Sequence, residues 1–219
     1  MNKSLYDCFS HWYHEGKGQV YLYSDPHFGD TEMKHLRTNY IGDDEQVKRI
    51  NSKMGKYDTI VFLGDIGDVN FIKRIRGYKV LIQGNHDSGA ANYRRHITKV
   101  LLEGQIIQCD DNHLFDEVYE GILIIGPKLI LSHEPINFEY GLNIHGHDHS
   151  KLYMKDDKHL NICAEHIDYT PICLKTIIQS GMLKNIPDIH RTVIDTATER
   201  KLKRKNKAKS MTNCRSLLN

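Results

Sequence analysis

Three short apolar runs early in the chain each lead directly into acidic, amide or imidazole side chains. They are rich in β-branched and aromatic residues, which predicts buried strands. Residues 19–24 lead into Asp25-Pro26-His27, residues 58–63 into Gly64-Asp65, and residues 78–82 into Gly84-Asn85-His86-Asp87. The sequence therefore predicts strands that deliver polar groups at their carboxyl ends.

Helical segments separate these predicted strands. Val47, Ile50 and Met54 recur at helical intervals, which predicts a helix from an N-cap at Asp43 or Asp44 through Met54. A second helix is expected over residues 68–76. The alternation of strand, polar loop, helix and strand is typical of α/β proteins, in which ligand sites collect outside the carboxyl ends of the strands.

The second half of the chain has a different pattern. A helix is expected over residues 90–102, and after it come closely spaced apolar runs that leave no room for helices. These runs cover residues 105–108, 114–119, 122–125 and 129–131, and they predict a second, mostly antiparallel sheet. Further runs at residues 142–144, 160–163 and 172–178 are expected to complete the fold. Two of the runs again end in imidazoles, one at His133 and one at His145-Gly146-His147-Asp148-His149.

Carboxylate oxygens and imidazole nitrogens are the ligands that borderline divalent cations prefer, and five separate loops offer them here. Four of the loops have a simpler explanation when taken alone, whereas few structural turns need all of Gly84, Asn85, His86 and Asp87. Asp25 and His27 fit an exposed turn, Asp65 fits a helix cap, and His133 fits a buried core histidine. His147 and His149 fit a surface cluster. The shared placement at strand ends favours a metal site over these separate explanations.

In this order, Asp-x-His, Gly-Asp, Gly-Asn-His-Asp, His and Gly-His-x-His resemble the signature of the calcineurin-like metallophosphoesterase superfamily. The resemblance covers residues 20–178 and is closest to the small bacterial and phage phosphoesterases. It implies a four-layer α/β/β/α sandwich with two mixed β-sheets and a pair of metal ions at one rim. Gly64-Asp65 lacks the Asp-Arg-Gly continuation of the Ser/Thr protein phosphatases, which are set aside.

The resemblance also implies individual roles. Asp65 is expected to bridge two cations. His86 is expected to protonate the leaving alkoxide or to stabilise the developing charge on the phosphoryl group, with Asp87 orienting His86. The other expected ligands are Asp25, His27 and His149 for the first cation, and Asn85, His133 and His147 for the second. Mn²⁺ is the expected metal, and Fe, Zn²⁺, Co²⁺ or Ni²⁺ also suits such ligands.

Several residues depart from the family pattern or have two explanations. Asp30 stands where many relatives have histidine, so a contact around the metals is expected to change. His145 is expected to be structural. Asn161, Glu165 and His166 lie within reach of the site, although roles as ordinary strand and turn residues explain them as well.

The expected activity is hydrolysis of phosphodiesters of nucleotides or nucleic acids, by attack on phosphorus of a hydroxide shared by two cations. A phosphomonoesterase or nucleotide phosphatase uses the same metals, and the sequence does not separate the two. A non-catalytic binding scaffold of the same fold is a further alternative. It is disfavoured because each expected ligand position keeps a competent side chain.

The 219 residues suit one domain, which we expect over residues 1–186. The rest, 187–219, is expected to be a basic flexible tail. Residues 191–219 hold nine of the 30 basic residues, against only Asp195 and Glu199. Such a tail suits contact with nucleic acid as well as simple solvation. The five scattered cysteines predict reduced thiols, and the lack of a long apolar run predicts a cytoplasmic protein without membrane contact.

Overall fold

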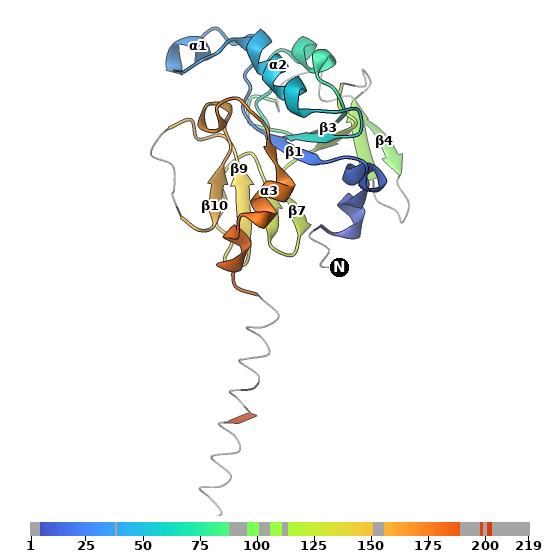
Figure 1. The fold of residues 1–219 in the computed structure, drawn as a ribbon, viewed down its shortest axis with the longest axis vertical. Helices are drawn as coiled ribbons and strands as arrows, with labels where there is room; N and C mark the ends of the chain where they lie inside the picture. The colour runs from blue at the N-terminus through green and yellow to red at the C-terminus, as the bar shows by residue number, and fades with distance from the viewer. Residues whose placement is uncertain are drawn as a thin grey trace, which may run out of the picture.

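A computed structural model of the chain describes residues 5–37, 39–87, 96–100, 106–110, 114–150 and 156–188, together with Thr198, Lys201 and Leu202. Its larger sheet has seven strands in the order β11-β1-β2-β3-β6-β5-β4 (Figure 1). These strands are β1 (Val20–Tyr23), β2 (Thr59–Phe62), β3 (Tyr78–Ile82), β4 (His96–Val100), β5 (Ile106–Asp110), β6 (Glu117–Tyr119) and β11 (Ile172–Cys173).

The larger sheet is mixed. β1, β2, β3 and β6 run parallel to one another. β11 pairs antiparallel with β1 at one edge, and at the other edge β5 pairs antiparallel with both β6 and β4. The parallel register places Tyr23 of β1 beside Phe62 of β2, and Phe62 beside Leu81 of β3. The three predicted strands thus end side by side, and their polar loops emerge at one edge of the sheet.

The smaller sheet has four strands in the order β10-β9-β8-β7 and is also mixed. β7 and β8 are antiparallel, and β8, β9 and β10 are parallel. The strands are β7 (Leu123–Gly126), β8 (Leu129–Leu131), β9 (Leu142–His145) and β10 (His159–Asn161). At the rim a parallel bridge joins Ser24, just after β1, to Cys163, just after β10, so the two sheets meet beside the polar loops.

One hydrophobic core lies between the sheets and a second lies on the outer face of the larger sheet. The first joins Leu22 of β1 and Val80 of β3 to Leu131 of β8 and Ile144 of β9. The second packs Ile60 and Phe62 against the helices α2 (Asp43–Lys53) and η2 (Val69–Arg74), the latter a 3₁₀ helix. The predicted fold class, an α/β sandwich of two mixed sheets flanked by helices, is confirmed.

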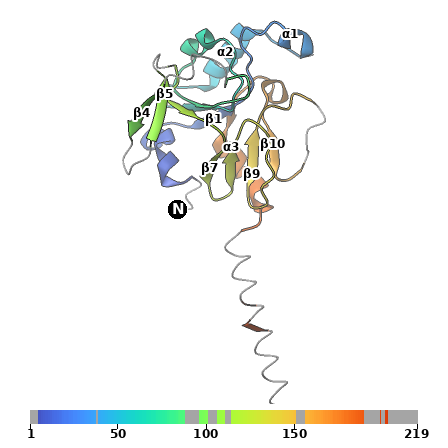
Figure 2. The ribbon, with the colours of Figure 1, turned by 180° about the vertical axis from the view of Figure 1, so that it is seen from behind.

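The remaining helices lie around these layers. The helix α3 (Leu174–Gln179) inserts Leu174 and Ile177 into the core between the sheets, and η5 (Met182–Lys184) follows it. Two short helices, α1 (Met33–Leu36) and η4 (Ala164–Ile167), lie near the rim that carries the polar loops. The same arrangement is visible from behind in Figure 2.

Several predicted elements differ in the structure. Residues 96–100 form the strand β4 and not part of a helix over 90–102; the rest of that predicted helix lies outside the described residues. β5 and β6 join the larger sheet, so the second sheet is built from fewer of the predicted runs and is mixed. Of residues 172–178, only Ile172 and Cys173 are extended, and the remainder is helix α3.

The 3₁₀ segment η1 (Asp7–Gly16) is fixed to the larger sheet by a buried carboxylate. Glu117, at the start of β6, is fully buried and accepts hydrogen bonds from the indole of Trp12 at 3.1 Å and the hydroxyls of Tyr78 at 2.7 Å and Tyr119 at 2.6 Å. His11 Nε2 lies 2.5 Å from the same carboxylate. These partners satisfy a charge that would otherwise be costly to bury.

Other predictions concern the tail, the cysteines and the membrane. The predicted tail over 187–219 falls mostly outside the described residues, and its flexibility and nucleic-acid contact stay predictions. Cys8, Cys163 and Cys173 are free thiols. Within the described part of the chain, no helix has the length and apolar character needed to span a membrane.

Candidate metal centre

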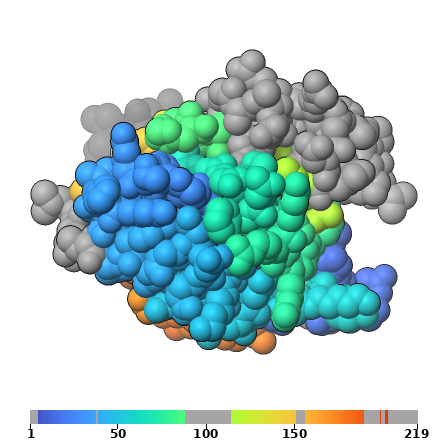
Figure 3. All heavy atoms as spheres, turned by 90° about the horizontal axis from the view of Figure 1, so that it is seen from above, coloured from blue at the N-terminus to red at the C-terminus, as the bar shows by residue number. Residues whose placement is uncertain are grey.

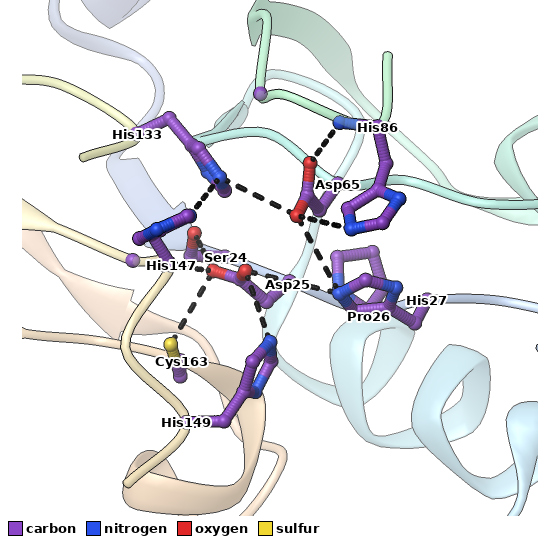
Figure 4. Close-up of polar contacts among 12 residues, drawn as sticks. Ser24, Asp25, Pro26, His27, Asp65, His86, His133, His147, His149 and Cys163 are labelled. Atoms are coloured by element: carbon purple, nitrogen blue, oxygen red, sulfur yellow. Dashed lines mark hydrogen bonds and ion pairs between the residues drawn. The ribbon is translucent and has the colours of Figure 1, made fainter. Parts of the chain in front are cut away.

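The structure brings all seven predicted ligands together at the rim where the strand ends meet (Figure 4). They come from the loops that follow β1, β2, β3, β8 and β9. Figure 3 views the molecule from above, where most of the described surface belongs to the blue-to-green N-terminal part of the chain. The predicted ligands are Asp25, His27, Asp65, Asn85, His133, His147 and His149.

The backbone at four of these positions adopts a conformation that L-residues rarely occupy. Asp25, His27, Asp65 and His147 have φ angles of 55°, 47°, 54° and 66°. Such conformations cost about 1–3 kcal/mol each and persist where the surroundings impose them. Here neighbouring loops hold one another, because Asp25 N–H donates to Gly64 O at 3.1 Å and His27 N–H donates to Asp65 O at 3.0 Å.

Glycine is required where the loops cross. Gly64 has a φ of 92°, and a Cβ there would lie 2.6 Å from His133 Nδ1 and from the backbone of Gly84. A Cβ at Gly146 would lie 2.0 Å from Asp25 Oδ2. The glycines that the sequence places beside Asp65 and His147 thus allow the close approach of the loops.

Each of the two aspartates has one carboxylate oxygen bound to the protein and one directed into the centre. Asp25 Oδ2 accepts hydrogen bonds from Ser24 Oγ at 2.5 Å, from His147 N–H at 3.0 Å and from Cys163 Sγ at 3.4 Å. Asp65 Oδ1 accepts one from His86 N–H at 3.0 Å. The other oxygens, Asp25 Oδ1 and Asp65 Oδ2, face the imidazoles.

Four atoms define a first candidate cation position. His149 Nε2 lies 3.4 Å and His27 Nε2 3.9 Å from Asp25 Oδ1, and His27 Nε2 lies 3.6 Å from Asp65 Oδ2. Asp25 Oδ1 and His27 Nε2 are both buried and have no hydrogen-bond partner among the described residues. Buried polar atoms without a partner are rare, and a cation between them would satisfy both. These residues therefore fit a divalent metal ion.

A second candidate position lies on the other side of Asp65. His133 Nε2 is 3.4 Å from Asp65 Oδ2 and 2.9 Å from Asn85 Oδ1, and His147 Nδ1 is 3.0 Å from the same amide oxygen. Asp65 Oδ2 thus belongs to both groups of atoms. One shared carboxylate between two groups is the arrangement expected for a bridging ligand.

Hydrogen bonds orient two of the imidazoles. His133 Nδ1 lies 2.7 Å from Leu63 O, a carbonyl that can only accept, so Nδ1 carries the proton and Nε2 faces the centre. His149 Nδ1 lies 2.5 Å from the Glu165 carboxylate, and its Nε2 likewise faces inward. Asp30, the departure from the family pattern, lies 3.6 Å from His27 Nδ1. Such partners set the tautomer and direction of metal-binding histidines.

The electrostatics of the centre favour positive charge. Burial alone would lower the pKa of His149, yet the carboxylates of Asp25 and Glu165 raise it to about 9. His133 is raised to a pKa of about 9 by Asp65 and Asp25 against the same effect of burial. Burial opposes ionisation of Asp25 as well, but the nearby imidazoles hold its pKa well below the usual range. Burial lowers the pKa of His27 to about 4, so this imidazole is neutral at pH 7.

Glu165 and Arg37 hold residues of the first candidate cation position in place. Of these two, the sequence indicated only Glu165. Glu165 binds His149 through one oxygen, and its other oxygen lies 3.4 Å from Arg37 Nε. The Arg37 guanidinium donates to Asp25 O at 2.7 Å. The sequence placed Glu165 within reach of the site and did not single out Arg37, because nothing near residue 37 indicates that it returns to the first loop.

The other residues within reach have structural contacts. Asn161 donates to Asp148 O at 2.7 Å, and His166 Nε2 lies 3.2 Å from the same carbonyl. His145 is buried, with Nδ1 2.9 Å from Gly146 O, which agrees with a structural role.

The two predicted catalytic residues differ in their surroundings. The side chain of His86 is 67% exposed, and its Nε2 lies 4.0 Å from Asp65 Oδ2. Asp87 is buried, and its carboxylate accepts hydrogen bonds from the backbone N–H groups of Asp65 at 2.8 Å, Ile66 at 3.0 Å and Gly84 at 2.9 Å. No hydrogen bond or ion pair joins Asp87 to His86 in the described residues. Asp87 therefore orients the loops that carry Asp65 and Asn85, not the His86 ring.

Comparison with known proteins identifies the fold and no family. No family model and no curated protein sequence matches the chain. A solved structure of a protein of unknown function from Aquifex aeolicus, AQ665, is 22% identical with a TM-score of 0.56, over 74% of this chain and 98% of that one. The nuclease MPE from Pseudomonas putida is 20% identical with a TM-score of 0.39, over 58% of this chain and 60% of that one. At this identity the first likeness establishes a shared fold only, and the second is too low to establish even that.

Proposed function

We propose that this chain is a metal-dependent phosphoester hydrolase that acts on phosphodiesters of the nucleotide or nucleic-acid type. The observation that carries the proposal is the pair of buried atoms without partners, Asp25 Oδ1 and His27 Nε2, beside an Asp65 oxygen that two groups of ligands share. The ordered motifs that resemble the metallophosphoesterases support the same assignment. We further propose that Mn²⁺ is the metal.

Each predicted ligand would have a defined role in binding the two cations. Asp25, His27 and His149 would hold one cation, Asn85, His133 and His147 the other, and Asp65 would contact both. Divalent cations in such a pair polarise the phosphoryl group and lower the pKa of a water molecule, which makes the water a nucleophile at neutral pH. Neutral imidazole and amide ligands complete the two shells without adding negative charge, which keeps the centre attractive to a phosphate.

His86 is the proposed proton donor to the leaving alcohol. Its backbone N–H is fixed to Asp65, while its ring is exposed and lies beside His27, with ring centroids 5.4 Å apart. Imidazole is the side chain that most often acts as a general acid in enzymes. The position lets the ring reach a substrate at the centre without displacing a ligand.

The test compares the wild-type protein with Asp65→Asn and His147→Ala. Each protein is stripped of metal, resupplied with Mn²⁺ or other divalent cations, and assayed with bis(p-nitrophenyl) phosphate and p-nitrophenyl phosphate. Metal binding is measured separately by calorimetry. Asp44→Asn is the matched control, because this aspartate is 85% exposed and pairs with Arg74 outside the centre.

We expect hydrolysis by the wild type only with metal, faster for the diester, and a loss of at least about a thousandfold in both variants of the centre. The control should retain wild-type turnover. Undiminished hydrolysis by Asp65→Asn, or the same rate without metal, would refute the proposal.

A further inference from the structure

Two pockets border the candidate metal centre, one at each end. The first has a volume of about 450 Å³ and lies between His149 and Glu165 on one side and Met33 and Leu36 of α1 on the other. The second has a volume of about 190 Å³ and lies beside Asn85 and His133. Figure 4 shows His133 and His149 at opposite ends of the cluster. A molecule bound at the centre therefore has room on both sides.

The first pocket suits an uncharged group. Arg37 and Glu165 supply the guanidinium and the carboxylate of its lining; their side chains are 2% and 9% exposed and lie 3.4 Å apart, so each neutralises the other. Leu36 presents an apolar wall, and it is 73% exposed although large apolar side chains are normally covered. The volume falls within the range of small-ligand sites and is large enough for a ring system.

The second pocket is smaller and has a similar character. Ile122, which is 52% exposed, and the half-buried Ile136 supply apolar surface, and Ser132 adds a hydroxyl. The exposed carboxylate of Glu134 also lines it. A second phosphate there would meet this carboxylate, so an uncharged group is again favoured.

We propose that the centre binds a phosphodiester whose two ester groups are both uncharged and ring-sized, one in each pocket. The inference rests on the proposed function and names its substrate class. A monoester would leave one pocket empty, and in the second pocket its additional negative charge would lie nearer the Glu134 carboxylate. A diester carries a single negative charge, on the phosphoryl group that the cations would hold, and would bury apolar surface at both ends.

The test uses two diesters and three alanine variants of exposed side chains. Bis(p-nitrophenyl) phosphate has a ring on each side, and methyl p-nitrophenyl phosphate has a ring on one side only. Leu36→Ala trims the first pocket and Ile122→Ala the second. Ile124→Ala is the matched control, because Ile124 lies in β7 two residues after Ile122, is 51% exposed and lines neither pocket.

With Mn²⁺ supplied, Leu36→Ala and Ile122→Ala should each lower kcat/KM for the bis-aryl diester about tenfold, while Ile124→Ala leaves it unchanged. The methyl diester should respond to only one of the two pocket variants. Calorimetric binding of diphenyl phosphate, which carries two rings, should weaken in both pocket variants. Circular dichroism checks that each variant is folded.

Two failures are distinguishable. If the wild type hydrolyses no phosphoester with any cation, the proposed function and this inference fall together. If it hydrolyses phosphoesters but neither pocket variant changes turnover of the bis-aryl diester, or both variants affect the methyl diester equally, only the inference about the pockets is overturned.

Discussion

The contacts of Glu165 with His149 and Arg37 give the sharpest test of how the first candidate cation position is built. Glu165→Gln keeps the size of the side chain and removes its charge. In the native protein the Glu165 carboxylate lies between two partners, His149 Nδ1 at 2.5 Å and Arg37 Nε at 3.4 Å. The variant therefore loosens the orientation of a predicted ligand and leaves a buried guanidinium without its counter-charge.

The expected losses of metal affinity and of folding stability can both be estimated. Loss of a hydrogen-bonded partner behind a metal-binding histidine typically weakens metal binding about 10- to 100-fold, or about 1.4–2.8 kcal/mol. Breaking a buried ion pair costs about 3–5 kcal/mol of folding stability. We expect about 3 kcal/mol here, because Arg37 keeps its bond to Asp25 O at 2.7 Å.

Calorimetric titration with Mn²⁺ measures the first effect and urea unfolding of the metal-free protein the second. Glu120→Gln, a change at an exposed glutamate outside the centre, is the control. A double-mutant cycle with His149→Ala decides the mechanism. If Glu165 acts through His149, Glu165→Gln adds no further loss of metal affinity to His149→Ala, and full additivity of the two losses would refute the reasoning.

Three other predictions follow from single residues. His86→Ala should lower kcat about 100- to 10,000-fold and leave the urea midpoint unchanged, because the side chain is 67% exposed; equal loss in stability and activity would contradict this. Gly64→Ala should lower the free energy of unfolding by about 3 kcal/mol or more, because the new Cβ would lie 2.6 Å from His133 Nδ1. Gly121→Ala, at a φ of 82° with open space around it, should lower it by about 1 kcal/mol. Equal losses in urea unfolding would exclude the steric explanation. Burial opposes ionisation of Glu117, but the hydrogen bonds to its carboxylate hold the pKa of Glu117 below the usual value. The ionised carboxylate therefore stabilises the fold fully above about pH 4.3, and this stabilisation is lost as the pH falls through the folded-state pKa. Glu117→Gln should therefore cost about 2 kcal/mol at pH 7 and flatten the acid limb of a stability-versus-pH curve, and an unchanged limb would argue against this role.

The parts of the fold that the sequence predicted well are those in which local pattern and burial agree. The strands before Asp25, Asp65 and Asn85 are short β-branched runs that end in a turn, and a parallel sheet needs that pattern. The helix-cap explanation of Asp65 is wrong: Asp68 caps the next helix, with its Oδ1 2.9 Å from Asn70 N, and Asp65 faces the centre.

Other elements depend on information that local pattern does not carry. The run at 172–178 reads as a strand by composition, yet Leu174, Ile177 and Ile178 recur at helical spacing and pack as a helix. Ile97, Thr98 and Val100 are β-branched, which favours the observed strand over a helix. Arg37 was missed because its role depends on contacts with a backbone carbonyl 12 residues earlier and a carboxylate more than 100 residues later.

The hydrogen bonds to one carboxylate oxygen of Asp25 and one of Asp65 affect which cations the candidate centre would bind. Each carboxylate has one oxygen that accepts hydrogen bonds from the protein, which orients the other oxygen toward a cation and disfavours binding through both. Ca²⁺ favours six to eight oxygen ligands and often takes carboxylates through both oxygens. If the centre binds metal as proposed, the hydrogen bonds that position the two aspartates would disfavour calcium. Selectivity for small cations that accept nitrogen ligands would then depend on the loops as well as on the ligand types.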